Sequence, residues 1–336
     1  MIDTVYYFIL NMSIASCFVI VALLLIRQIR PLSRRIIYPL WALAFFRLVM
    51  PFTLPTQWSL FNFTGGLVKR LITVETITHG MAPVQDSWMP IQDNWGPVQD
   101  SVIPIQGSSS SFMNTVGVAN QYVPVEYRTQ SLRQVFTTSA VIWAIIGAAV
   151  IIAALILYTL TRRELNKATH IRDNLYNSDM LLSPVLAGLF RPRIILPVSL
   201  DPDSEEGKMI ISHESVHRRR FDNLWRLVAI CITCLHWFNP FVWVMLKAFF
   251  TDMELSCDEA VIGKYNAEER KTYAKTLVEF AEDKRMLIST AFGRAGVKVR
   301  IVNVLNYKKL TLIGVVASSL FLLAVTVVLI TNPIRG

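Results

Sequence analysis

Long runs without charged residues divide the chain into segments. Residues 4–26, 134–161 and 310–334 carry no charge, and residues 36–54 carry one cation, Arg47. About 20 apolar residues suffice to cross a hydrocarbon core ~30 Å thick, so the pattern predicts four transmembrane helices. A signal peptide is the competing interpretation of the first run. It is disfavoured because the residues MIDT carry an acid and no base, and no cleavage site follows.

The positive charges predict which side of the membrane each segment faces. Short loops rich in arginine and lysine stay in the cytoplasm. The first run is followed by such a loop, the third run is followed by a second basic cluster, and two lysines precede the last run. We therefore expect both termini outside the cell and residues 162–309 in the cytoplasm. The cations concerned are Arg27, Arg30, Arg34, Arg35, Arg162, Arg163, Lys167, Arg172, Lys308 and Lys309.

Residues 55–135 form the expected external loop, which contains a repeat. The units PVQDSWM, PIQDNWG, PVQDSVI and PIQGSSS follow one another with a period of seven. Proline in each unit blocks a helix and no apolar face forms, so the repeat predicts an extended low-complexity stalk. A ligand-binding role for Trp88 and Trp95 stays open. The units start at Pro83, Pro90, Pro97 and Pro104.

Composition agrees with a membrane protein. The 336 residues are 53% hydrophobic and 17% charged, and the mean hydropathy is +0.44, values that do not describe a soluble surface. The net charge of +9 would suggest a nucleic-acid partner if the cations did not cluster at predicted membrane boundaries. None of the four cysteines falls in the external loop, so no disulfide framework is expected. Residues 162–309 are long enough for one folded domain.

The strongest chemical signal is HESVH at residues 213–217. Ser204 or Asp203 is a suitable N-cap for a helix here. On that helix His213 and His217 lie one turn apart, where two imidazoles can bind one Zn²⁺. Glu214 beside them can deprotonate a zinc-bound water, which is the HExxH arrangement. The alternative is a pair of structural histidines.

A catalytic zinc needs a third protein ligand and an open coordination position. In the helix-compatible stretch TDMELSCDEAV, Glu254 and Asp258 lie one turn apart. We expect Glu254 to bind the metal and Asp258 to accept a hydrogen bond from a ligand histidine. The alternative is that these acids form a solvated helix surface. The downstream candidates weighed were Asp222, His236, Glu254, Asp258 and Glu259.

Residues 227–246 are also free of charge. If this stretch crossed the bilayer, about 30 Å of hydrocarbon would separate His213 from Glu254. Asn239-Pro240 breaks a helix at its middle. We therefore expect a re-entrant or membrane-apposed hairpin over residues 227–250 that returns to the cytoplasmic side. The CxxC of Cys231 and Cys234 is interpreted as packing.

Taken together, these segments resemble the BlaR/MecR-type family of membrane metallopeptidases, the antirepressor gluzincins. The resemblance rests on HESVH, FDNL, HWFNPFVW and ELSCDEAV, with SPVLAGLFRPRIILP before them and KVRIVNVLNYKK after them. It implies that His213, His217 and Glu254 bind Zn²⁺ and that Glu214 is the general base. The implied fold is a mainly α integral membrane protein with four transmembrane helices and a cytoplasmic α+β zincin (gluzincin-like) protease domain. A strand within residues 183–197 would line the cleft.

The same resemblance implies a bacterial plasma-membrane protein that acts in signal transduction. The expected function is to cleave or inactivate a cytoplasmic winged-helix repressor in response to an external stimulus. The best-known members sense β-lactams through an external penicillin-binding domain after the last helix. The residues TNPIRG cannot hold its SxxK module, so direct covalent β-lactam sensing is not expected.

Several further hypotheses concern catalysis. No oxyanion donor is identified, and Tyr265, Tyr273 and Arg294 are the candidates. Small residues and two glycines in residues 287–298 favour a loop that fills the cleft or is cut by the protein itself near Phe292.

Three competing functions remain. The chain could be a non-proteolytic membrane signal transducer or a housekeeping membrane zinc endopeptidase. DNA binding through Arg218, Arg219 and Arg220 is weaker, because phospholipid headgroups or a substrate explain these arginines equally well. No direct nucleic-acid partner is expected, and a homodimer stays open.

Overall fold

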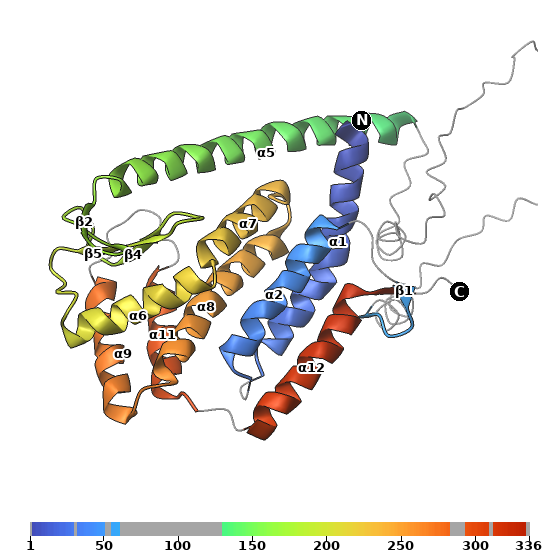
Figure 1. The fold of residues 1–336 in the computed structure, drawn as a ribbon. Coiled ribbons are helices and arrows are strands. Elements are labelled where there is room, and N and C mark those ends of the chain that lie inside the picture. The colour runs from blue at the N-terminus through green and yellow to red at the C-terminus, as the bar shows by residue number, and fades with distance from the viewer. Residues whose placement is uncertain are drawn as a thin grey trace, which may run out of the picture.

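The computed structural model describes residues 2–29, 32–50, 55–60, 130–282, 293–308 and 312–333. The proline repeat, with Trp88 and Trp95, and Phe292 lie outside the described residues. The described chain is mostly helical and carries one four-stranded sheet (Figure 1).

Each of the four apolar runs forms a helix over most of its described residues. They form α1 (Ile2–Ile26), α2 (Arg34–Val49), α5 (Gln130–Leu165) and α12 (Leu312–Ile330). In the described chain, α1 and residues Gln134–Leu165 of α5 are long and apolar enough to cross a membrane, whereas α12 contains a shorter apolar stretch. The four-span count therefore stays a prediction.

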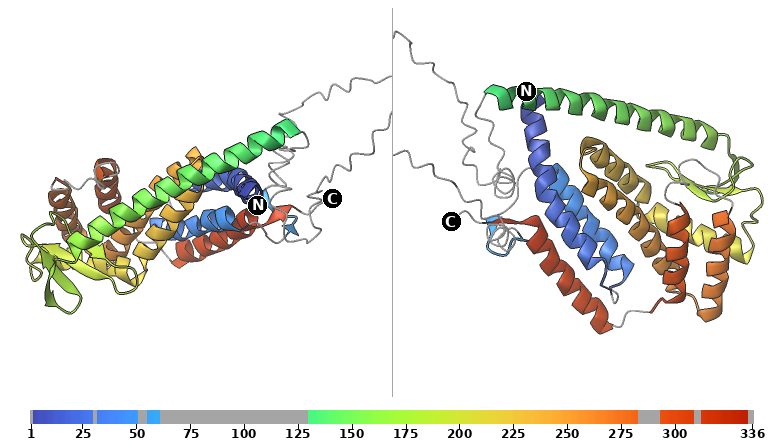
Figure 2. Two further views of the ribbon diagram at one scale, coloured as in Figure 1. Left: turned by 90° about the horizontal axis from the view of Figure 1, so that it is seen from above. Right: turned by 180° about the vertical axis from the view of Figure 1, so that it is seen from behind.

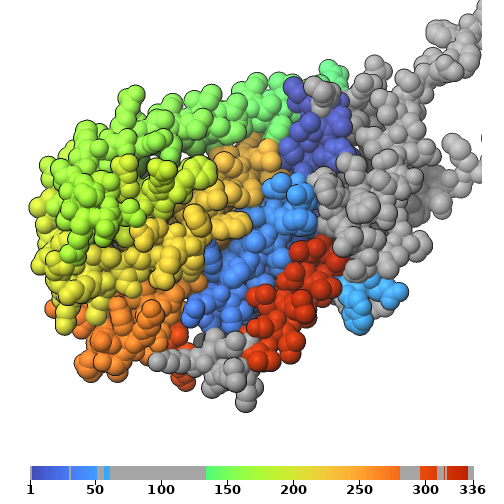
Figure 3. Space-filling view, viewed as in Figure 1, coloured from blue at the N-terminus to red at the C-terminus, as the bar shows by residue number. Residues whose placement is uncertain are grey.

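The apolar helices pack around a shared core. Buried side chains of α1 and α2 contact those of the long helix α8 (Pro240–Ile262), and α12 packs on α2. In the space-filling view the blue surface of α2 and the red surface of α12 adjoin (Figure 3). Arg47 is fully buried in this bundle, and its Nη1 lies 3.4 Å from the carbonyl oxygen of Ile330 in α12. The cation of this apolar run thus contacts a neighbouring helix.

The charge-free stretch at residues 227–246 is broken into a helical hairpin. α7 (Asp222–Leu235) ends before His236, and α8 begins at Pro240. The side chain of Asn239 caps α8 by accepting the Phe241 N–H at 2.9 Å, and proline at the first helical position has no N–H to lose. The two helices pack against each other, so the chain returns to the side from which α7 started.

A small sheet lies between the end of α5 and α6 (Glu205–Arg219), as both views of Figure 2 show. Its strand order is β2-β3-β5-β4, and β4 is an edge strand that pairs antiparallel with β5. Leu186, Ile194 and Leu196 of the sheet pack on Ile210 of α6. The strands are β2 (Thr169–Arg172), β3 (Leu175–Ser178), β4 (Val185–Ala187) and β5 (Arg193–Pro197).

Two of the local expectations can be checked here. Ser204 is the N-cap of α6, and its Oγ accepts the Gly207 N–H at 2.9 Å, which confirms the expected helix start. The loop expected over residues 287–298 is wrong from Gly293 onward, because residue 293 begins α11 (Gly293–Leu305). α11 packs against α9 (Ala267–Glu282) and α8, so tertiary contacts outweigh the low helix propensity of the two glycines.

Beyond the apolar bundle, α8 is tied to the loop between α1 and α2. The fully buried Asp252 accepts hydrogen bonds from Arg27 Nε, at 2.9 Å to each oxygen, and from Trp41 Nε1 at 3.0 Å. Two turns further along α8, the Glu259 carboxylate accepts hydrogen bonds from the Ser33 hydroxyl and from the Arg34 backbone N–H. Both acids hold the helix that carries Glu254 against α1 and α2.

Replacing Asp252 by alanine should destabilise the protein by about 2–3 kcal/mol. Removing one partner of a buried pair typically costs ~3–5 kcal/mol, and the loss is smaller here because the side chains of Arg27 and Arg34 keep 27% and 24% exposure. Thermal unfolding of the purified protein in mild detergent measures the change. Glu164→Ala is the control, since its pair with Lys167 is exposed. An unchanged midpoint for Asp252→Ala would contradict the proposed role of the pair.

Candidate metal centre

Two buried histidines on one face of α6 form the centre of the site. His213 and His217 are 6% and 2% exposed, and their Nε2 atoms lie 3.1 Å apart. The i, i+4 spacing places one ring above the other by a single helical turn. The sheet and α8 pack on α6, which removes both rings from solvent.

The other nitrogen of each ring faces a buried carboxylate. Asp222 Oδ2 lies 2.6 Å from His217 Nδ1. His213 Nδ1 lies 2.9 Å from the Tyr273 hydroxyl, which itself donates to Asp258 Oδ1 at 2.7 Å. With these acceptors at Nδ1, the proton of each neutral ring is held there and the lone pair lies on Nε2. In the structure, Arg300 Nη2 lies 3.3 Å from His213 Nε2. Both lone pairs thus face the side where the two Nε2 atoms meet, and an ion bound there would take the place of Arg300 as the partner of His213 Nε2.

Glu254 of α8 supplies oxygen atoms to the same point. Its Oε2 lies 3.6 Å from His213 Nε2 and its Oε1 lies 3.6 Å from His217 Nε2. Donors at ~2.0–2.1 Å from a tetrahedral Zn²⁺ are separated by roughly 3.3 Å. The spacing of two imidazoles and one carboxylate therefore fits a divalent ion with nitrogen and oxygen ligands.

Cys257 is a second candidate for the third ligand. Its sulfur and one nitrogen from each histidine lie within 4.8 Å of one another, and the thiol donates to the His213 carbonyl at 3.3 Å. Cys257 is fully buried, whereas the side chain of Glu254 is 28% exposed and lines the cleft. A catalytic metal needs an open position beside its ligands, which favours Glu254.

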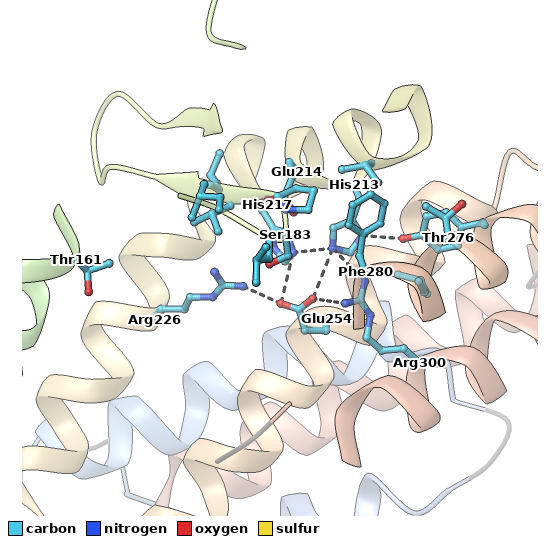
Figure 4. A pocket seen from close by; sticks show the side chains of 18 of the residues that line it. Thr161, Ser183, His213, Glu214, His217, Arg226, Glu254, Thr276, Phe280 and Arg300 are labelled. Atoms are coloured by element: carbon cyan, nitrogen blue, oxygen red, sulfur yellow. Dashed lines mark hydrogen bonds and ion pairs between the residues drawn. The ribbon is translucent and has the colours of Figure 1, made fainter. Parts of the chain in front are cut away.

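Two arginines flank the carboxylates of the site (Figure 4). Arg226 Nη2 lies 2.8 Å from Glu254 Oε1, and Arg300 Nη1 lies 3.2 Å from Glu254 Oε2. Arg300 also donates to both oxygens of Asp258 at 2.8 Å through Nε and Nη2. A guanidinium thus bridges the proposed ligand and the acid behind His213.

These contacts explain the charge states of the acids. Burial raises the pKa of the Asp258 carboxyl, but Arg300 and the hydrogen bond to His213 outweigh it and lower the pKa to about 2. The pKa of Glu254 is well below its ordinary value, because His217 and Arg300 outweigh its burial. Both groups are therefore carboxylates at neutral pH.

The pKa shifts of the histidines have a related cause. Burial alone lowers the pKa of His213 and His217, but the surrounding anionic groups raise it well above the ordinary value. Cys257 contributes most to this increase at both rings, and the two imidazoles in turn lower the pKa of its thiol against the effect of burial. The negative charge around the two rings thus favours a bound positive charge, and either protons or a divalent cation can provide it.

A cleft of about 540 Å³ opens over these residues. Glu214 lines it, and among the described residues this carboxylate has no hydrogen-bond partner, so it can accept a proton from a molecule in the cleft. β4 forms one wall through Val185 and Leu186, and α9 contributes Leu277 and Phe280. The walls are therefore largely apolar and the floor is polar.

The structure brings together His213, His217, Glu254, Asp258 and Glu214, the site residues expected from the sequence. Two of the weighed candidates lie elsewhere: His236 Nε2 faces the Leu48 carbonyl, and Glu259 contacts the α1–α2 loop. Tyr273, weighed as an oxyanion donor, has its hydroxyl committed to Asp258, and the side chain of Arg294 lies outside the described residues.

Four residues that contact the site were not placed there by the sequence analysis. The FDNL segment, which follows HESVH after three arginines, was a local signal for Asp222, which begins α7 beneath His217. Phe221 precedes α7, and its φ of 55° turns the chain sharply between α6 and α7, which brings Asp222 to His217. No local pattern indicates the other three, because they approach from separate helices. The four are Cys257, Asp222, Arg226 and Arg300.

Comparison with known proteins points to one family. The model of the BlaR1 peptidase M56 family matches residues 7–303. The regulatory protein BlaR1 of Bacillus licheniformis is 32% identical over 146 residues, covering 41% of this chain and 24% of that protein. BlaR1 of Staphylococcus aureus is 23% identical over 294 residues, covering 80% of this chain and 45% of that protein.

A further relative is the methicillin resistance mecR1 protein of Staphylococcus aureus. It is 25% identical over 99 residues, which are 29% of this chain and 17% of that protein. The chain thus spans less than half the length of the curated relatives that it matches.

The third ligand can be identified by substitution. Glu254→Gln should sharply reduce the metal content of the purified protein, whereas Cys257→Ser should leave one metal per chain, because only Glu254 borders the open cleft. Elemental analysis measures both. Cobalt loading adds a spectroscopic check, since thiolate ligation gives an intense charge-transfer absorption that carboxylate ligation lacks. Metal loss in Cys257→Ser with retention in Glu254→Gln would reverse the assignment.

Asp222→Asn should weaken metal affinity by about 10–100-fold, the usual effect of removing the carboxylate behind a ligand histidine. Competition with a chelator of known affinity measures this change. Asp203→Asn is the matched control, because Asp203 is exposed and its ion pair is with Arg172, away from the site. Equal metal affinity in the two variants would remove Asp222 from the site.

Proposed function

Because the chain belongs to the BlaR1 peptidase M56 family, a family of membrane metallopeptidases, we propose that it is a zinc endopeptidase that cuts a cytoplasmic protein during signal transduction. The observation that supports this function best is the convergence of two imidazole Nε2 atoms and the Glu254 carboxylate in a cleft that Glu214 also lines. Zinc is proposed because nitrogen ligands combined with one carboxylate are typical of catalytic zinc sites.

His213, His217 and Glu254 would hold the ion. Bound Zn²⁺ supplies a Lewis acid that polarises the scissile carbonyl and makes water nucleophilic near neutral pH. Asp222 and Asp258 keep the Nδ1 protons in place, so that both Nε2 lone pairs stay directed at one point. Glu214 accepts the proton of the attacking water and passes it to the nitrogen of the leaving amine.

The arginines have a positioning role in this proposal. Arg226 and Arg300 contact opposite oxygens of Glu254, so they fix the orientation of the carboxylate and prevent its rotation out of the site. Arg300 also lines the cleft, where its positive charge adjoins the place at which negative charge develops during carbonyl attack. It replaces the tyrosines as the oxyanion donor of this proposal.

A segment of extended polypeptide fits the cleft. β4 is an edge strand of the sheet, and Asn223 Nδ2 already donates to its outward Leu186 carbonyl, so the fit of a substrate rests on the lining of the cleft. The apolar walls around Leu186, Leu277 and Phe280 would take apolar substrate side chains. We propose a winged-helix transcriptional repressor as the substrate, as the resemblance to antirepressor peptidases implies, with a second cut in the chain itself near Phe292.

The proposed membrane arrangement has four spans, both termini outside and residues 162–309 in the cytoplasm, with the α7–α8 hairpin against the membrane. Its support is that Arg27 and Arg34, in the arginine-rich loop expected inside, contact Asp252, two residues from Glu254. The site and the basic loop therefore lie at the same end of the molecule, where family members would meet a cytoplasmic protein.

Glu214→Gln should lower the rate of proteolysis by about 10²–10⁴-fold, the contribution of a general base, while the protein keeps its metal. The measurement is cleavage of a co-expressed repressor under inducing conditions, followed by immunoblotting, together with zinc per chain. Glu206→Gln, in the first turn of the same helix, is the matched control and should cleave normally. Full metal content with no Glu214-dependent cleavage of any substrate would favour the non-proteolytic transducer.

A further inference from the structure

A second cavity lies beside the catalytic cleft, and Thr161 of α5 lines both. It has a volume of about 430 Å³ and is enclosed by the inner end of α5 and the hairpin that joins β4 to β5. α5 contributes Tyr158, Arg162 and Leu165, and the hairpin contributes Arg191 and Arg193 together with apolar side chains. None of these residues takes part in the proposed catalysis.

The cavity carries positive charge without a counter-charge. Three arginines line it and no acidic residue does. Within the described part of the chain, Arg162, Arg191 and Arg193 form no ion pair, and the planar group of Arg193 lies over the Tyr176 ring at 5.1 Å. Arginines gathered in this way suit a phosphate group, because the guanidinium presents paired donors to its oxygens.

The position along α5 sets the depth of the cavity relative to the membrane. The charge-free part of the helix ends at Thr161, and Arg162 is the first charged residue after it. Tyr158 lies one turn earlier, where aromatic residues mark the boundary between hydrocarbon and water. The cavity is therefore level with the phospholipid headgroups.

The hairpin offers an apolar tip at this depth. Phe190 is 83% exposed, and the turn is shaped by Gly188, whose φ of 99° is rarely adopted by residues with a side chain. The side chain of Asn223 donates to the carbonyls of Leu186 and Gly188 at 2.9 Å each. The tip is thus held in place against the start of α7, where Phe221 is also exposed.

We propose that this cavity binds an anionic phospholipid of the leaflet that faces the protease domain. The three arginines hold the phosphate group, and Tyr158 and Phe190 contact the first part of the acyl chains. The lipid lies against Ala187 at the end of β4, and the two other residues of this strand, Val185 and Leu186, line the catalytic cleft. Binding does not depend on zinc or on peptidase activity.

The test compares lipid retention by the full chain purified in mild detergent. Phosphatidylglycerol is added and the bound lipid is counted by native mass spectrometry, with phosphatidylcholine as the zwitterionic comparison. The variant Arg162→Gln, Arg191→Gln, Arg193→Gln should bind phosphatidylglycerol at least ~10-fold more weakly, since each cation near an anionic surface contributes about fivefold. The control removes the same charge elsewhere through Lys208→Gln, Lys271→Gln and Lys275→Gln, and should bind as the wild type does.

Two further comparisons distinguish a lipid site from a site for soluble anions. Phe190→Ser should weaken phosphatidylglycerol binding without changing the binding of inorganic phosphate, because only the lipid reaches the apolar tip. Metal content and thermal unfolding check that each variant is folded, and Arg191→Gln alone replaces a triple variant that does not fold. The proposal is overturned if phosphatidylcholine binds equally well, if glycerol phosphate binds as tightly as the lipid, or if the arginine and lysine variants retain the same amount of phosphatidylglycerol.

Discussion

The site depends on the two carboxylates that fix the protons of His213 and His217. Asp222 and Asp258 come from different helices, and each contacts the Nδ1 atom of one ring. Without them either ring could carry its proton on Nε2, and the pair would present one donor and one acceptor to the cleft instead of two lone pairs. The packing of α7, α8 and α9 around α6 can be understood as the framework that delivers these acceptors to a buried place.

A second constraint comes from the hydrocarbon layer. Glu254 follows a long apolar stretch, so it reaches the histidines only because Asn239 and Pro240 reverse the chain between α7 and α8. The apolar half of α8 packs among α1 and α2, and its last three turns carry the acids of the site. One helix thus belongs to both the apolar bundle and the candidate metal site.

Helical periodicity was sufficient to predict the pairs that lie one turn apart. His213 with His217, and Glu254 with Asp258, could be placed from their spacing, and the hairpin followed from the need to keep both pairs on one side of the membrane. Arg226 and Arg300 could not be placed in this way, because each belongs to a helix whose own pattern says nothing about its neighbours. The loop expected over residues 287–298 failed for a related reason: small residues lower helix propensity, but the packing of α11 on α8 and α9 compensates.

The two faces of α8 have a mechanical consequence. Asp252 and Glu259 are tied to the segment between α1 and α2, whereas Glu254 and Asp258 point to α6 and α11. A helix rises only ~1.5 Å per residue. If α1 and α2 slid by that distance relative to α6 and carried α8 with them, the Glu254 carboxylate would move away from the two imidazoles, which are held on α6. The bundle of α1 and α2 is therefore linked mechanically, through α8, to one of the three proposed ligands, and such a movement would separate that ligand from the other two.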